Sequence, residues 1–185
     1  MKQLRILDFD TENVPGFYWY DGATTDLLDT IAWSWMDETD VEVETITNFH
    51  VNFRDPTTSL TFPASGYVRF KEVVESADIV TGHNILRHDI PLLNATGLRL
   101  GEPQIRWPRT VDTLQFLRNM GLKGFPKGQE YLADHFGVGE RKMHVGLYTW
   151  ERAARGDLEA RGVVIERCVS DVISHKELYR ELMQL

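Results

Sequence analysis

The sequence contains a single cysteine, Cys168, among its 185 residues. One cysteine excludes a disulfide within the chain and a zinc site built from several cysteines, and it favours a reducing compartment. No uninterrupted apolar run approaches the ~20 residues that span a membrane. The first residues, Met1–Arg5, lack the apolar stretch of a signal peptide. We therefore expect a soluble cytoplasmic protein without a membrane segment.

Positive charge is also scarce, because 20 Lys and Arg stand against 28 Asp and Glu, a formal net charge of −8. Nucleic-acid phosphates are bound mainly by Lys and Arg, so this balance does not favour a simple electrostatic binder of nucleic acid. An enzyme that gathers carboxylates around metal ions can still be acidic overall and carry a local basic track. Candidates for such a track are Arg106, Arg109, Arg118, Lys123, Lys127, Arg141 and Lys142.

Apolar and aromatic residues are plentiful. The hydrophobic share is 42%, with nine Phe, six Tyr and five Trp, which argues against intrinsic disorder. A chain of this length can bury a real core within one domain. No repeat or low-complexity linker divides it, so we expect a single domain over residues 1–185.

Hydrophobic patterning predicts strands in the first half of the chain and alternating helices and strands in the second. Strands are expected at 4–10, 31–36, 41–46, 77–81 and 109–113, and loops at 13–30 and 48–65. Helices are expected at 67–76, at 87–95 with a stop at 94–97, from 113 to 120, at 129–136, and from Asp157 to the C-terminus. This order predicts an α/β fold with a central mixed sheet and helices on both faces.

The most informative local feature is a pair of acids, Asp10 and Glu12, at the end of the first apolar run. Side chains two residues apart on a strand point to the same face. The pair therefore presents two hard oxygen ligands side by side, as Mg²⁺ or Mn²⁺ requires. On its own, such a pair also fits a solvated strand end.

Two further acids stand in contexts that can complete a metal site. Asp89 follows a buried strand and a turn, in the first turn of a predicted helix, where an acid is also favoured by the helix dipole alone. Asp171 borders the apolar stripe of the last predicted helix. Arg167 and His175 lie four residues before and after it, on the same face. The alternative for Asp171 is an ordinary Arg–Asp pair on a solvated face.

Four segments, Phe9–Glu12, Gly82–Asn84, Asp89–Leu92 and Cys168–Val172, together resemble the three motifs of DEDD-type 3′→5′ exonucleases. This superfamily comprises ribonuclease-H-like proofreading domains and small stand-alone members that are frequent in bacteriophages. The motifs occur in the family's order. The resemblance implies a ribonuclease-H-like fold with a mixed five-stranded sheet and the release of nucleotides from DNA 3′ ends. For a phage protein, it implies the host cytoplasm and a role in DNA replication or repair.

The resemblance also implies roles for the four acids. They would hold two Mg²⁺ or Mn²⁺ ions about 3.5–4 Å apart. Asp10 would bridge both ions, Glu12 and Asp171 would complete the site of the ion that binds the attacking water, and Asp89 would hold the second ion. Such ions activate the water and neutralise charge on the phosphoryl group.

The terminal nucleotide would lie among Phe9, Thr11, His83 and Asn84, according to the same resemblance. Lys127 lies in the glycine-rich segment 121–128. It is a candidate contact for the substrate backbone, and a solvated loop is an equally open interpretation. Nucleic acid, with DNA favoured, is therefore the expected partner, and no protein partner is predicted.

The chain departs from the family at its general base. Members carry Tyr four residues, or His five residues, before the last aspartate, where this chain has Arg167 and Glu166. Arginine stays protonated and cannot act as a base. The metal ions can activate water with help from Glu166 or His175, or Arg167 can hold the scissile phosphate. Otherwise the chain is an inactive relative that binds nucleic acid or a partner. An RNA-directed exonuclease also stays open.

Overall fold

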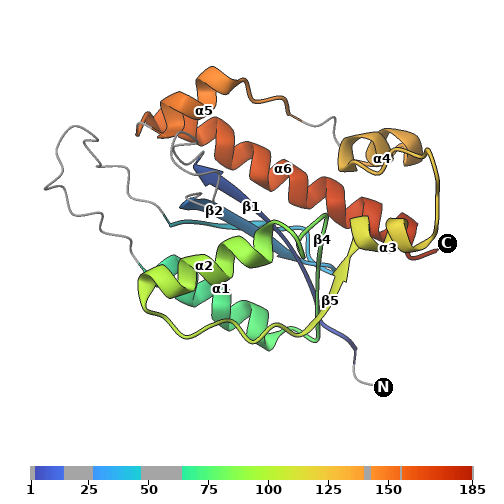
Figure 1. Ribbon diagram of the computed structural model, residues 1–185, viewed down its shortest axis with the longest axis horizontal. Coiled ribbons are helices and arrows are strands. Elements are labelled where there is room, and N and C mark those ends of the chain that lie inside the picture. The colour runs from blue at the N-terminus through green and yellow to red at the C-terminus, as the bar shows by residue number, and fades with distance from the viewer. Residues whose placement is uncertain (1–2, 15–26, 47–63, 140–142, 155, 185) are drawn as a thin grey trace, which may run out of the picture.

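The computed structural model describes residues 3–14, 27–46, 64–139, 143–154 and 156–184, and within them strands and helices form an α/β fold (Figure 1). The strands are β1 (Ile6–Val14), β2 (Leu27–Trp35), β3 (Glu42–Thr45), β4 (Ile79–Gly82) and β5 (Arg109–Asp112). The helices are α1 (Ala64–Ser76), α2 (Asp89–Leu100), α3 (Thr113–Asn119), α4 (Gln129–Phe136), α5 (Leu147–Ala154) and α6 (Leu158–Leu182).

The five strands form one mixed sheet in the order β3-β2-β1-β4-β5. The N-terminal strands β1, β2 and β3 pair antiparallel, whereas β1 pairs with β4, and β4 with β5, in parallel. Parallel neighbours need crossover connections, and α1 and α2 supply them. The predicted mixed five-stranded sheet is confirmed.

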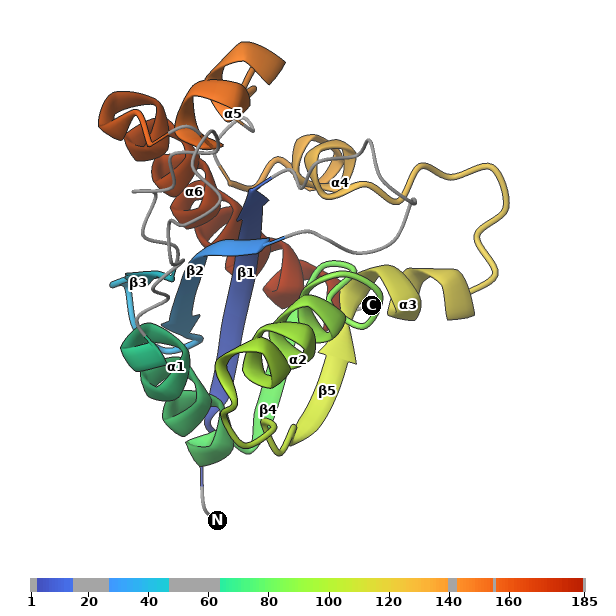
Figure 2. The same cartoon turned by 60° about the vertical axis from the view of Figure 1, so that its left-hand side comes forward.

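Helices cover both faces of this sheet, as predicted. Figures 1 and 2 show α1 and α2 on one face and α6 running across the other. Asp157 caps the start of α6 by accepting a hydrogen bond from the Ala160 N–H at 3.1 Å. Although α6 has 25 residues, no helix in the described ranges combines the length and apolar character that a membrane span needs.

Strand β1 is central, and its alternation separates the core from the candidate site. Leu7 and Phe9 are buried in the large hydrophobic cluster with Phe70 of α1. The intervening acidic side chains approach residues of α6: Asp8 contacts His175, and Glu12 contacts Arg167 among others. Strand side chains alternate between the two faces of the sheet, so a slip of one residue in the register of β1 would turn the acids into the core.

The structure corrects three predicted boundaries. β1 continues to Val14 and β2 begins at Leu27, both inside the predicted loop 13–30, because the two strands pair along most of their length, with a bulge at Glu12/Asn13. Cross-strand pairing outweighs the weak local pattern there. Helix α1 begins at Ala64, inside the predicted loop 48–65. Residues 15–26 and 48–63 of the predicted loops lie outside the described ranges. Helix α5 was not predicted.

Helix α2 also differs, because it begins at Asp89 and passes the predicted stop at 94–97. Gly97 is a packing position, since a Cβ there would lie 2.8 Å from Cζ of Tyr67. The helix ends instead at Gly101, whose φ of 70° is the left-handed conformation that glycine adopts at helix ends.

Candidate metal centre

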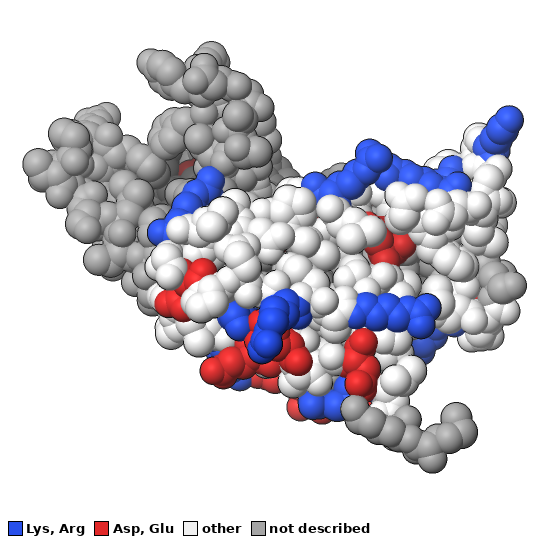
Figure 3. Space-filling model, turned by 60° about the horizontal axis from the view of Figure 1, so that its bottom comes forward, with Lys and Arg blue, Asp and Glu red and all other residues white. Residues whose placement is uncertain are grey.

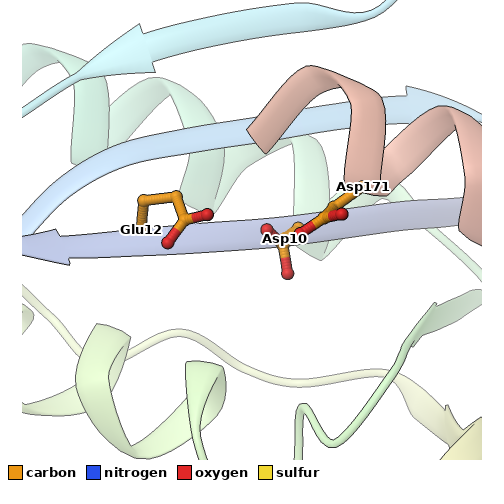
Figure 4. A group of neighbouring side chains, drawn as sticks. All are labelled: Asp10, Glu12 and Asp171. Carbon is orange, nitrogen blue, oxygen red and sulfur yellow. The ribbon is translucent and has the colours of Figure 1, made fainter. Parts of the chain in front are cut away.

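Three carboxylates meet between β1 and α6. Asp10, Glu12 and Asp171 each offer an oxygen, and these oxygens lie within 4.8 Å of one another. Figure 4 shows Asp10 and Glu12 on the strand and Asp171 reaching down from the helix. Glu12 and Asp171 are buried and Asp10 is half-buried. Three anions this close repel one another unless a cation or proton offsets them.

The packing of α6 on the sheet fixes Asp171 opposite the strand. Cys168 and Val172 are fully buried against Ala32 of β2. Asp171 directly precedes Val172 and so lies at the border of this contact. The Cys168 thiol lies 3.5 Å from the backbone oxygen of Asp10. Burial, and then the charges of Asp10 and Glu12, raise the pKa of this thiol well above its usual range, so it stays protonated.

Asp89 is held elsewhere, by Thr11. Its Oδ1 accepts hydrogen bonds from the Thr11 N–H at 3.0 Å and the Thr11 hydroxyl at 2.6 Å. Strand β4 pairs with β1 only as far as Asp8, so the Thr11 N–H beyond that point has no strand partner on this side. Burial raises the pKa of Asp89, and the hydrogen bonds from Thr11 oppose that shift. Asp89 is not one of the three clustered carboxylates.

The turn between β4 and α2 carries His83 and Asn84. Asn84 has a φ of 69°, a left-handed conformation that Asn tolerates better than most residues. Its N–H donates to Asp112 Oδ1 at 3.0 Å, and the Leu86 N–H donates to Asp112 Oδ2 at 3.0 Å. His83 Nδ1 lies 3.0 Å from the hydroxyl of Thr113. The end of β5 therefore fixes this turn.

Sequence reasoning missed the role of Asp112. The same carboxylate caps α3 by accepting from the Gln115 N–H at 3.1 Å. An Asp followed three residues later by Gln is a sequence signature of a helix start, so this signal was available. Its second function, to hold a turn 26–28 residues away, depends on the parallel pairing of β4 and β5.

Arg167 lies among the clustered carboxylates. Its Nε is 2.9 Å from Glu12 Oε1 and 3.7 Å from Asp171 Oδ2. On another side, its guanidinium carbon lies 5.5 Å from the centre of the Trp150 ring of α5, within the range of a cation–π contact. The predicted Arg167–Asp171 neighbours are therefore together, but in a mostly buried cluster and not on a solvated face.

His175 does not face the cluster. Its Nδ1 lies 2.6 Å from Asp8 Oδ2 and its Nε2 lies 2.8 Å from the Thr113 hydroxyl, in a fully buried network. Burial raises the pKa of Asp8, and the charge of His175 opposes this. Because both ring nitrogens are engaged inside the core, these contacts do not support the prediction that His175 assists water activation.

Three other predicted site residues have different surroundings from those expected. Phe9 is fully buried, with its ring centre 5.8 Å from that of Trp107 and in a stacked orientation, because alternation turns it away from Asp10. Lys127 Nζ donates to the carbonyl oxygens of Leu122 and Phe125, at 2.7 and 3.0 Å, which closes its own loop. Glu166 is exposed on α6.

Two members of the expected basic track, Arg106 and Lys127, have partners within the protein. Arg141 and Lys142 lie outside the described residues, and Arg106 pairs with Glu75 at 3.3 Å. On the face drawn in Figure 3, Lys and Arg lie beside Asp and Glu at several places. Outside the candidate track, Arg69 pairs with Glu42 and Glu44, and Lys71 pairs with Glu75. Such local pairing weakens any positive field there.

Comparison with known proteins supports the architecture. No protein-family model and no curated protein sequence matches the chain. Among solved structures, it is similar to a family B DNA polymerase from the hyperthermophilic archaeon Pyrobaculum calidifontis, with a TM-score of 0.69 and 20% sequence identity. The match covers 98% of this chain and 25% of the polymerase, so the chain spans about a quarter of its length. This likeness shows the fold alone, which is ribonuclease-H-like.

Proposed function

We propose that this protein is a metal-dependent 3′→5′ exonuclease that hydrolyses phosphodiester bonds at DNA ends. The observation that carries the proposal is the meeting of Asp10, Glu12 and Asp171 between β1 and α6. The ribonuclease-H-like fold supports it, as does the order of the motifs along the chain. The structural neighbour is a DNA polymerase, which favours DNA over RNA as the substrate and a role in replication or repair.

The donor set fits hard divalent cations. Three carboxylate oxygens within 4.8 Å of one another are the ligands that Mg²⁺ and Mn²⁺ accept. Asp10, Glu12 and Asp171 would hold one ion, and Asp10 with Asp89 would hold a second. Bound ions of this kind lower the pKa of water and stabilise charge on the phosphoryl oxygens. The residues of β1, α2 and α6 orient the carboxylates for that task.

Arg167 is assigned to the substrate phosphate, because a guanidinium presents a planar fork of donors that matches phosphate oxygens. Asn84 and His83 lie on the turn that Asp112 and Thr113 fix, and we assign them to the terminal nucleotide. Arg167, which cannot act as a base, stands at the position of the tyrosine that the resemblance implies. General-base help typically contributes ~10²–10⁴-fold, so we expect slower turnover than in relatives that retain it.

A second candidate function is a catalytically impaired relative that binds nucleic acid or a protein partner. The observation that favours it is the ion pair of Arg167 with Glu12, which offsets part of the repulsion that otherwise requires a metal. Retention of all four motif acids favours the enzyme. The two candidates differ in one respect that can be measured, which is cleavage of a labelled strand.

The test uses a single-stranded DNA labelled at its 5′ end, with Mg²⁺, Mn²⁺ or EDTA. The exonuclease shortens it stepwise from the 3′ end, only with metal, and Asp171→Asn abolishes the ladder. Asp134→Asn, which removes an exposed carboxylate on α4, is the control and leaves it intact. Binding without shortening under every metal overturns the enzyme in favour of the binding module. Degradation of a matching RNA but not DNA assigns the activity to RNA.

A further inference from the structure

The guanidinium of Arg167 contacts two carboxylates, Glu12 and Asp171, that a metal ion in this site would also contact. Its Nε lies 2.9 Å from Glu12 Oε1, a distance at which the same oxygen cannot also be in full contact with a divalent ion without strong repulsion between the cations. The side chain is 22% exposed, and those of Glu12 and Asp171 are 10% and 7% exposed. Solvent therefore screens this cluster only weakly.

The contact is ionic but not a directed hydrogen bond. Within the described residues, Arg167 Nε–H is buried and is aimed at no acceptor, although Glu12 is at ion-pair distance. An undirected contact is easier to exchange than a bidentate one. The Trp150 ring, 5.5 Å from the guanidinium carbon, gives the cation a second surface on which it can stay when it leaves the carboxylates.

We propose that Arg167 is the internal counter-cation of the metal-free site and competes with divalent metal for Glu12 and Asp171. The proposal rests on the proposed function, because it takes these acids as metal ligands. Metal entry displaces the guanidinium, which then pairs with a substrate phosphate. Metal and nucleotide therefore bind cooperatively, and by linkage each strengthens the other to the same extent.

The test is calorimetric titration of metal-free protein with Mn²⁺, with and without thymidine 5′-monophosphate. Arg167→Gln and Arg167→Met remove the charge, and Arg180→Gln is the matched control. Arg180 lies on the same helix and donates to the Met36 carbonyl, away from the cluster. We expect both Arg167 variants to bind Mn²⁺ at least tenfold more tightly than the unsubstituted protein without nucleotide. Addition of the nucleotide should strengthen their Mn²⁺ binding less.

A second readout is thermal unfolding, which requires no activity. In EDTA the Arg167 variants should melt below the unsubstituted protein, because Glu12 and Asp171 lose the cation that pairs with them. Saturating Mn²⁺ should raise the melting temperature of the variants by more than that of the unsubstituted protein, since at a given free concentration a tighter ligand stabilises the folded state more.

Equal Mn²⁺ affinity in the unsubstituted protein and both Arg167 variants overturns the competition and leaves the exonuclease proposal standing. Weaker binding by the variants also overturns it, since Arg167 would then support the metal. Absence of Mn²⁺ binding in every protein overturns the competition and the metal-dependent function together, and the strand-cleavage assay above then shows no ladder. Arg180→Gln removes one positive charge outside the cluster, so Mn²⁺ affinity equal to that of the unsubstituted protein in this variant excludes a general charge effect.

Discussion

The Thr11 hydroxyl donates to Oδ1 of Asp89 at 2.6 Å, which joins the strand that carries two clustered acids to the first turn of α2. The Thr11 N–H donates to the same oxygen. One carboxylate oxygen thus ties together segments 78 residues apart. This contact positions the fourth motif acid from the side of the sheet opposite α6, and it gives Thr11 a role that its place between Asp10 and Glu12 does not reveal.

Replacement of Thr11 by valine should destabilise the protein, because it keeps the shape of the side chain and removes one donor to a buried carboxylate. The expected loss is ~1–3 kcal/mol in the free energy of unfolding, measured by urea denaturation. Thr11→Ser restores the donor and should recover most of the loss. Equal stability of the valine variant and the unsubstituted protein would show that the contact contributes nothing.

His175→Leu should act on folding and not on the chemical step. It leaves Asp8 buried without its partner, which typically destabilises by ~3–5 kcal/mol. Urea denaturation measures that loss. The rate constant for strand shortening, per folded molecule, should change by less than tenfold. The interpretation fails if the variant keeps its stability while its rate constant for strand shortening falls a hundredfold.

Gly82→Ala should destabilise the turn before α2. A Cβ at Gly82 would lie 2.8 Å from the backbone oxygen of Phe9, a group that cannot rotate away. Overpacking of this kind typically destabilises by ~1–3 kcal/mol. Gly128→Ala is the matched control, since nothing lies within 4 Å of its Cβ position and its φ of −70° suits alanine. Thermal unfolding of the two variants compares them directly, and equal melting temperatures would refute the close approach.

Glu75 should contribute to stability at neutral pH and lose that contribution in acid. Hydrogen bonds from Lys71 and from the Arg106 backbone lower its pKa from 4.5 to about 2. A carboxyl with a lowered folded-state pKa stabilises fully above its unfolded pKa and loses the effect as pH falls through the folded value. Glu75→Gln should therefore be less stable by about 1 kcal/mol at pH 7, with a difference that shrinks from pH 4.5 towards pH 2. Urea midpoints at pH 7 and pH 3 test this, and a constant difference would contradict it.

The sheet was predictable from the sequence because its signals are local. Alternation at 31–36 and 41–46 predicted two strands, and the i, i+2 spacing of Asp10 and Glu12 predicted their common face. The same alternation places Phe9 on the opposite face, in the core. Its assignment to a nucleotide pocket is therefore inconsistent with the strand pattern that predicts the acidic face. The strand pattern is the better guide there.

The parts that could not be predicted depend on long-range pairing. The bond of Thr11 to Asp89 exists because β4 stops pairing with β1 at Asp8. Helix spacing predicted that Arg167 lies beside Asp171, but it gave no indication that Arg167 would also contact Glu12. The sequence also did not reveal that His175 contacts Asp8. The position of a residue in a helix predicts the direction of its side chain, but its partner depends on which strand packs against that face.

Anomalous X-ray diffraction from crystals soaked in Mn²⁺ tests the central claim most directly, because it locates the metal without reference to activity. We predict anomalous peaks in contact with the carboxylates of Asp10, Glu12 and Asp171, with the guanidinium of Arg167 moved from Glu12, and loss of those peaks in Asp171→Asn. Crystals that contain no peak among these three carboxylates at saturating Mn²⁺, with Arg167 still paired to Glu12, would contradict the account.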